Sequence, residues 1–211
     1  TNITSLGSGT NPFLPYTKDK HSKLRYKFKG SENIDKNYSQ TYQDMFVLTM
    51  LNGKTNGKYL EIGAADPFYG SNSALLEQLG WKGTSLEILE EEVTKFNKVR
   101  KNPALLVDAT KYDYKTLRGH IDYLQVDCEP PATTFAILKM IPFEQCTFGV
   151  ITFEHDYYAD VTRSFREKSR NYLLSKGYVL VASNIAPDDT SAYEDWYVHP
   201  KHVDPEIIKI M

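Results

Sequence analysis

The sequence contains very little cysteine. Cys128 and Cys146 are the only two in a chain of 211 residues, and no C-x-x-C pair occurs. A disulfide framework and a zinc–thiolate site both need more thiols than this, so we expect neither. A reducing compartment is the simpler setting for such a chain, and the sequence therefore predicts a cytoplasmic protein.

Long apolar runs and an excess of one charge are also missing. No stretch approaches the roughly 20 consecutive apolar residues that span a bilayer, and residues 1–15 lack the apolar segment of a signal peptide. The formal net charge is only −2, so no overall field draws the chain to nucleic acid or to an anionic membrane. We expect neither a nucleic-acid partner nor a membrane partner.

The chain divides into an irregular region and a regular one. Residues 1–37 are polar and rich in turn formers, and the segment 18–29 is basic. We interpret 1–37 as an N-terminal extension or active-site lid, in preference to a nucleic-acid-binding arm. Residues 38–211 have the length of one α/β domain, since domains take roughly 100 to 200 residues.

In the regular region, strand-like and helix-like segments alternate. Strands are expected at 58–62, 83–88, 104–107, 121–126, 147–153, 178–182 and 196–198. Helices are expected at 45–51 with Ser39 as N-cap, then at 73–79, 90–99, 135–140 and 161–175. This alternation predicts a mostly parallel sheet covered on both faces, and the last two strands predict a C-terminal β-hairpin.

The first predicted strand ends in a glycine turn, Glu61-Ile62-Gly63-Ala64-Ala65-Asp66. Gly63 lets the backbone approach a ligand closely, but the turn is not G-x-G-x-x-G and offers no good cradle for a pyrophosphate. This argues against a dinucleotide cofactor. A nucleoside cofactor without phosphates suits such a turn better. S-adenosylmethionine (SAM) carries no phosphate, and its charged methionine portion needs carboxylate and backbone partners instead.

Acidic residues follow three later strands. Ligands of such sheets bind beyond the carboxyl ends of the strands, so these positions are candidate contacts. Glu87 is placed to accept hydrogen bonds from ribose hydroxyls, or it is simply an acid at the start of a helix. Asp108 is placed for an adenine amino group or caps the next segment, and Asp127 falls near the methionine portion or the acceptor.

From residue 38 to 203 the chain resembles the FkbM family of SAM-dependent methyltransferases. The matching segments are Tyr38–Asp44, Glu61–Ala64, Ser71–Asn72, Gly80–Gly83, Glu87, Ile121–Leu124, Asp127, Glu129, Val150–His155 and Glu194–Trp196. The resemblance implies a class I, Rossmann-like fold with seven strands and O-methylation of a small molecule such as a sugar or natural product. It also implies a set of SAM contacts, to which we add Ile88 and Ala109: Glu61, Gly63, Ala64, Asn72, Glu87, Asp108 and Asp127.

One segment departs from the family pattern. Asp-x-Glu-Gly is common after the fourth strand, whereas this chain has Asp127-Cys128-Glu129-Pro130-Pro131. Proline has no amide donor, so this turn cannot offer the backbone N–H groups of the glycine version. Acceptor selection near Glu129 is therefore the least transferable part of the resemblance.

Candidate catalytic residues gather after the fourth and fifth strands. His155, Asp127 and Glu129 are the main candidates, with Glu154 and Asp156 beside them. His155 is favoured as the base because an unperturbed imidazole titrates at about pH 6.5; the alternative is a buried structural histidine. The same carboxylates suit Mg²⁺ or Mn²⁺, although no ligand spacing demands a metal.

The helix expected at 161–175 carries arginines at 163, 166 and 170, on one face if the helix is regular. They either grip an anionic group of the acceptor or form a solvated face. Two other functions also remain open for the chain as a whole. One is a SAM-binding module without activity, and the other, disfavoured by the lone Gly63 turn, is a nicotinamide-dependent oxidoreductase.

Overall fold

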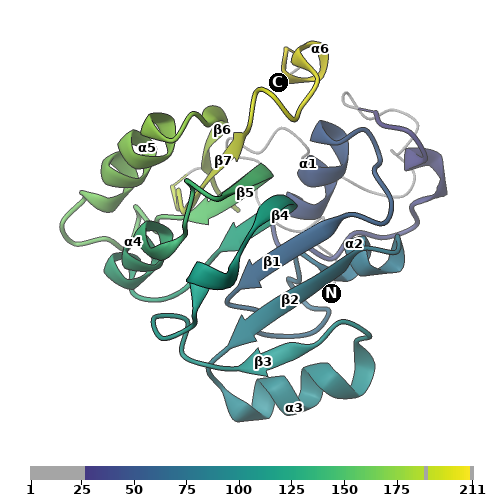
Figure 1. Ribbon diagram of the computed structural model, residues 1–211, viewed down its shortest axis with the longest axis horizontal. Helices are drawn as coiled ribbons and strands as arrows, with labels where there is room; N and C mark the ends of the chain where they lie inside the picture. Colours follow the sequence, from purple (N-terminus) through teal and green to yellow (C-terminus); the bar gives the residue numbers. More distant parts are fainter. Residues whose placement is uncertain (1–26, 188–189, 210–211) are drawn as a thin grey trace.

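The strand β5 (Cys146–Glu154) is buried on both faces, which is why its sequence is a nearly continuous apolar run. In the first strand, Tyr59 packs into one core cluster, while Leu60 and Ile62 pack into a second cluster on the opposite face. The computed structural model describes residues 27–187 and 190–209. Figure 1 shows the sheet with its helices around it.

The strands are β1 (Lys58–Ile62), β2 (Lys82–Glu87), β3 (Ala104–Leu106), β4 (Gly119–Val126), β5 (Cys146–Glu154), β6 (Val179–Ile185) and β7 (Glu194–Val198). The helices are α1 (Gln43–Met50), α2 (Ala74–Gln78), α3 (Glu90–Val99), α4 (Pro131–Met140), α5 (Phe165–Ser175) and α6 (Pro205–Ile208). Side chains of α1 and α2 belong to the first core cluster, and those of α4 and α5 to the second.

The seven strands form one sheet in the order β3-β2-β1-β4-β5-β7-β6. The pairs among β1 to β5 are parallel, whereas β7 runs antiparallel to both β5 and β6. The expected parallel sheet and C-terminal hairpin are therefore confirmed. Chain order reverses between β1 and β4, so the carboxyl ends of these strands form the switch point where ligands of such sheets bind.

The prediction of Ser39 as a helix N-cap was wrong. Helix α1 begins at Gln43, and its N-cap is Tyr42, with φ of 69°. Ser39 lies further upstream, where its hydroxyl accepts from the amide of Asp44 and the Asp44 carboxylate accepts from the amides of Tyr38 and Ser39. A local side-chain turn thus replaces the expected first turn of helix.

Helix α5 begins at Phe165, four residues later than expected. The Asp160 carboxylate accepts hydrogen bonds from the amides of Thr162, Ser164 and Phe165, which holds this segment in a turn. Arg163 lies in that turn with φ of 52° and is not on the helix. The expected face of three arginines on one helix is therefore not formed.

The predicted N-terminal extension falls largely outside the described residues. In its described part, Phe28 and Ile34 are buried in the core cluster that contains α1. A role for residues 1–37 as a lid stays a prediction. Among the helices of the described chain, none has the length and apolar character needed to cross a membrane.

Candidate active site

A cavity of about 430 Å³ lies at the carboxyl ends of the central parallel strands. This volume falls within the range of roughly 300 to 1,000 Å³ that is usual for small-molecule sites. The cavity wall contains the predicted residues Gly63, Glu87, Ile88, Asp108, Ala109, Asp127 and Glu129. The fold therefore brings together most of the predicted cofactor set, although the sequence did not single out wall residues such as Thr133 and Ile137.

The glycine turn after β1 packs directly against the end of β4. Gly63 has φ of 88°, and a Cβ at this position would collide with the carbonyl oxygen of Asp127. Its amide donates to the carbonyl of Leu86 in β2, and the amide of Asp127 donates to the carbonyl of Ile62. Only glycine combines this backbone conformation with so close an approach.

Glu87 ends β2 with its carboxylate turned toward the turn after β1. One oxygen accepts from the amide of Ala65 at 2.8 Å, and the other accepts from the amides of Ile88 and Leu89 at 3.1 Å. An ionised carboxylate has about four acceptor positions, so these three bonds leave capacity for a ligand hydroxyl. The side chains of Ile88 and Leu89 stay largely exposed beside it.

Asp108 occupies the rim of the cavity after β3. Its Oδ1 accepts from the amide of Thr110 at 2.9 Å and from the Thr110 hydroxyl at 2.6 Å. These bonds lower the pKa of Asp108. The carboxylate thus does cap the following turn, and it is also an ionised acceptor in the cavity wall.

Three residues of the predicted cofactor set lie behind the wall. The buried Glu61 carboxylate accepts from the hydroxyls of Ser73 and Ser85, and burial raises its pKa. Ala64 packs in a small core cluster with Phe96. Any effect of Glu61 and Ala64 on a ligand therefore acts through the backbone of the turn.

Asn72 is the third residue behind the wall. Its amide donates to Gln125 Oε1 at 2.7 Å, and Gln125 Nε2 donates to the carbonyl of Gly63 at 2.8 Å. The Oδ1 atom of Asn72 is buried, and no described residue bonds to it. A buried acceptor without a partner is unfavourable, so this atom calls for a donor that the protein does not supply.

Four acids crowd together where β4 and β5 end: Asp127, Glu129, Glu154 and Asp156. Oxygen atoms of Glu129, Glu154 and Asp156 lie within 4.8 Å of one another. Burial, followed by the neighbouring carboxylates, raises the pKa of Asp127 to about 6 and that of Glu154 well above its usual range. Glu154 hydrogen-bonds to both Asp127 and Asp156, which requires this group of acids to hold protons.

A fifth acid, Glu194 on β7, extends this acidic cluster into the core. It pairs in register with Glu154, and it accepts from the indole of Trp196 at 2.7 Å and from Gln43 at 3.3 Å. Burial, and then the charge of Asp127, raise the pKa of Glu194 to about 8. Sequence reasoning did not assign this residue a role, although it begins the Glu194-Asp195-Trp196 segment of the family resemblance.

His155, the base favoured from the sequence, is not among the residues that line the cavity. Its side chain is fully buried, with Nδ1 accepting from the amide of Tyr157 and Nε2 lying 3.4 Å from Asp195. Asp195 is in turn held by Arg170 Nε at 2.8 Å. Side chains alternate along a strand, so when Glu154 faces the acidic cluster, His155 faces the other way.

The three arginines, for which a grip on the acceptor and a solvated face were both open, are engaged within the protein. The guanidinium of Arg166 lies 3.6 Å from the ring centroid of Tyr157, and that of Arg163 lies 4.7 Å from the same centroid. Arg170 binds Asp195 through two nitrogens. These contacts make the arginines part of the support behind β5.

The fold matches solved methyltransferase structures at low identity. A protein of Clostridium thermocellum assigned as an rRNA methylase gives a TM-score of 0.55 with 14% identity, over 78% of this chain and 99% of that one. An rRNA methylase of Streptococcus thermophilus gives 0.52 with 13% identity, over 79% and 98%. TrmK of M. capricolum, solved with S-adenosylhomocysteine, gives 0.53 with 15% identity, over 80% and 74%.

These likenesses confirm the class I, Rossmann-like methyltransferase fold. No protein-family model matches the sequence, and comparison with curated proteins gives no match. The resemblance to the FkbM family therefore stays a prediction.

Proposed function

We propose that this protein is a SAM-dependent methyltransferase that acts on a hydroxyl group. The observation that carries the proposal is the continuity of one cavity wall, which runs from the Gly63 turn and Glu87 to Asp127 and Glu129. One end of the wall has hydrogen-bond acceptors beside apolar side chains. The other end has the Asp127 carboxyl, whose pKa is raised by burial.

The residues present fit SAM well. Glu87 would accept from a ribose hydroxyl, Ile88 and Ala109 would flank the adenine, and Asp108 would accept from its amino group. Of the two places open to Asp127, the methionine portion and the acceptor, we assign it to the acceptor, and the unpartnered Oδ1 of Asn72 is an acceptor suited to the ammonium group of SAM. Bound there, SAM supplies an electrophilic methyl group.

Asp127 is the favoured general base, in place of His155. A base works best when its pKa lies near the operating pH, and burial among carboxyls raises the pKa of Asp127 to about 6. Ionised Asp127 would take the proton of the acceptor hydroxyl as the oxygen attacks, and Glu154 would share the negative charge through its hydrogen bond. Glu129, exposed at the mouth, would orient the acceptor.

A small-molecule acceptor, such as a sugar or natural product, suits the acidic mouth. RNA is the second candidate, because two of the structural neighbours are named as rRNA methylases. The crowded carboxylates oppose a phosphate backbone at the same place, and the net charge of −2 adds no attraction. We therefore favour an uncharged hydroxyl-bearing molecule.

Mg²⁺ or Mn²⁺ is an additional component that the acidic cluster accommodates. Glu129, Glu154 and Asp156 offer oxygen ligands, which hard cations prefer. A cation there would acidify the acceptor hydroxyl. Excess chelator should then abolish turnover and leave SAM affinity unchanged, whereas full turnover in chelator would assign the chemistry to Asp127 without metal.

Two measurements test the proposal. Calorimetric titration should detect SAM but not NAD, since the Gly63 turn lacks a pyrophosphate cradle; NAD binding alone would contradict it. A screen of acceptors with radiolabelled SAM then distinguishes an enzyme from a SAM-binding module without activity. Transfer to sugars or natural products supports our acceptor class, and transfer only to RNA refutes it.

A further inference from the structure

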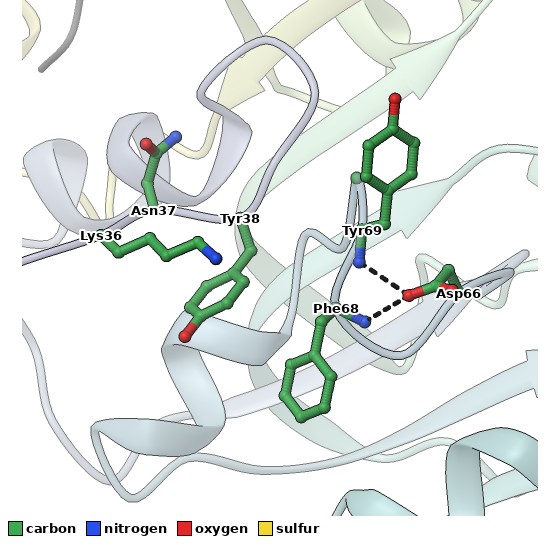
Figure 2. A pocket seen from close by; sticks show the side chains of 7 residues that line it. Lys36, Asn37, Tyr38, Asp66, Phe68 and Tyr69 are labelled. Carbon is green, nitrogen blue, oxygen red and sulfur yellow. Dashed lines mark hydrogen bonds between the residues drawn. The ribbon is translucent and has the colours of Figure 1, made fainter. Parts of the chain in front are cut away.

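A second cavity, of about 180 Å³, lies between two segments far apart in the sequence. Lys36 and Tyr38 enter it from the segment before α1, and Asp66, Phe68 and Tyr69 belong to the loop after β1 (Figure 2). A parallel β-bridge joins the two segments. We call these five residues the aromatic cleft. It shares no wall residue with the cofactor cavity.

The segments that carry the rings of the aromatic cleft are held in place by hydrogen bonds. The carboxylate of Asp66 accepts from the amides of Phe68 at 2.9 Å and Tyr69 at 2.7 Å, as the dashed lines in Figure 2 show. Gln78 donates to the hydroxyl of Tyr38 at 2.9 Å. The loop is therefore preorganised, so a ligand would not bear the cost of ordering it.

The same rings are left in contact with solvent. Tyr69 is 63% exposed and Phe68 is 37% exposed, and the ring of Phe68 lies 5.9 Å from that of Tyr38. A rigid loop that presents aromatic faces to water is suited to stacking against a planar ring, as in proteins that bind nucleobases. The volume of the cleft suits one such ring system.

The charge of the aromatic cleft decides between ligand classes. Aromatic groups of this kind also bind quaternary ammonium ions. Here, however, the ammonium of Lys36 already lies 5.0 Å from the ring centroid of Tyr38, and the Asp66 carboxylate is ion-paired with Lys95. Since Lys95 offsets the charge of Asp66, the Lys36 ammonium is the charge that the cleft wall presents, which favours a ring that carries an anion.

We propose that the aromatic cleft binds a mononucleotide, with its base against Phe68 and its phosphate toward Lys36. The ligand class combines a planar ring with a phosphate, which matches the two features of the cleft. The site does not depend on the cofactor, because the loop that forms it is fixed without one.

Residue-resolved NMR with AMP as the probe tests this proposal. Amide signals of Phe68, Tyr69 and Gly70 should shift on titration, whereas signals of Glu87 and Ile88 report on the cofactor cavity separately. Adenosine should bind the cleft several-fold more weakly than AMP, because it lacks the phosphate. Phe68→Ala and Lys36→Gln should each weaken AMP binding at the cleft about tenfold.

Lys98→Gln is the matched control, since Lys98 is exposed on α3 and is not part of the cleft; it should bind AMP like the parent protein. Melting temperatures close to that of the parent would show that the variants are folded. Shifts confined to Glu87 and Ile88, or AMP affinity unchanged in Phe68→Ala, would overturn the proposal. Equal affinity for AMP and inorganic phosphate would overturn the role of the rings. Much tighter binding of a short single-stranded RNA in the cleft would overturn the choice of a mononucleotide.

Discussion

Two groups of acids lie at one edge of the sheet, one at the ends of β2 and β3 and the other at the ends of β4 and β5. The surroundings of the two groups differ. Glu87 and Asp108 accept bonds from nearby amides and from a hydroxyl, and those bonds lower the pKa of Asp108. Asp127 and Glu154 are buried among other carboxyls, and their pKa values rise. The first pair is built to accept hydrogen bonds, and the second to exchange protons.

The largest effect should come from removing the proposed base. Asp127→Asn should reduce turnover about a hundredfold to ten-thousandfold, the usual contribution of a positioned general base. SAM affinity should change only a few-fold, because the amide keeps the shape of the side chain. Steady-state kinetics and calorimetry would measure the two quantities. Equal losses in turnover and in SAM affinity would contradict the assignment of SAM binding to one end of the wall and of proton transfer to the other.

A matched change at the other end should affect binding instead. Glu87→Ala should weaken SAM affinity by about 1 to 3 kcal/mol, since it removes a charged hydrogen-bond acceptor. Asp108→Asn keeps an acceptor at the rim and should cost less. Calorimetric titration of both variants against the parent gives the comparison. Unchanged SAM affinity in a folded Glu87→Ala protein would remove the proposed ribose contact.

The acidic cluster should also make stability depend on pH. The pKa values of Asp127 and Glu194 rise on folding, to about 6 and about 8, so the folded state binds these protons more tightly than the unfolded chain does. The contribution of these two carboxyls to stability is therefore greatest at acidic pH and falls as pH rises through these values.

We expect a melting temperature several degrees lower at pH 8.5 than at pH 5.5. The drop should be smaller in Glu154→Gln, because this change removes one titrating carboxyl from the cluster. Thermal unfolding at the two pH values, in buffers of equal ionic strength, is the measurement. A melting temperature that rises over this range would show that the carboxyls are not held protonated.

The smallest effect on chemistry should come from His155. Because it is buried against Asp195, His155→Gln should lower the melting temperature but reduce turnover less than tenfold, and the pH dependence of turnover should keep its shape. Rate measurements across pH 5 to 9 would check this. Loss of an acidic limb near the histidine pKa would return His155 to the role of base.

Much of the fold was predictable because its signals are local. Apolar runs located the strands, and the helix expected at residues 90–99 is the observed α3. The later start of α5 was not predictable from helical spacing, since the Asp160 carboxylate captures the amides that a first turn would leave free.

The site was predictable in position but not in orientation. Acids at strand ends located Glu87, Asp108 and Asp127, because topology alone brings strand ends together. The direction of the His155 side chain follows from the alternation of side chains along β5. The prediction of His155 as the base did not take this alternation into account. The raised pKa values arise from side chains that meet only in the folded chain, and no sequence spacing encodes them.

The protons held by the acidic cluster have a calorimetric consequence. Any ligand that prefers the ionised carboxylates must expel protons, and the buffer takes them up. The apparent binding enthalpy would then vary with the ionisation heat of the buffer, and the slope of that dependence counts the protons released. The apparent affinity of such a ligand would weaken as the solution becomes more acidic than about pH 6, the value to which the pKa of Asp127 is raised. A titration series in several buffers would thus reveal contact with β4 and β5 before any product is identified.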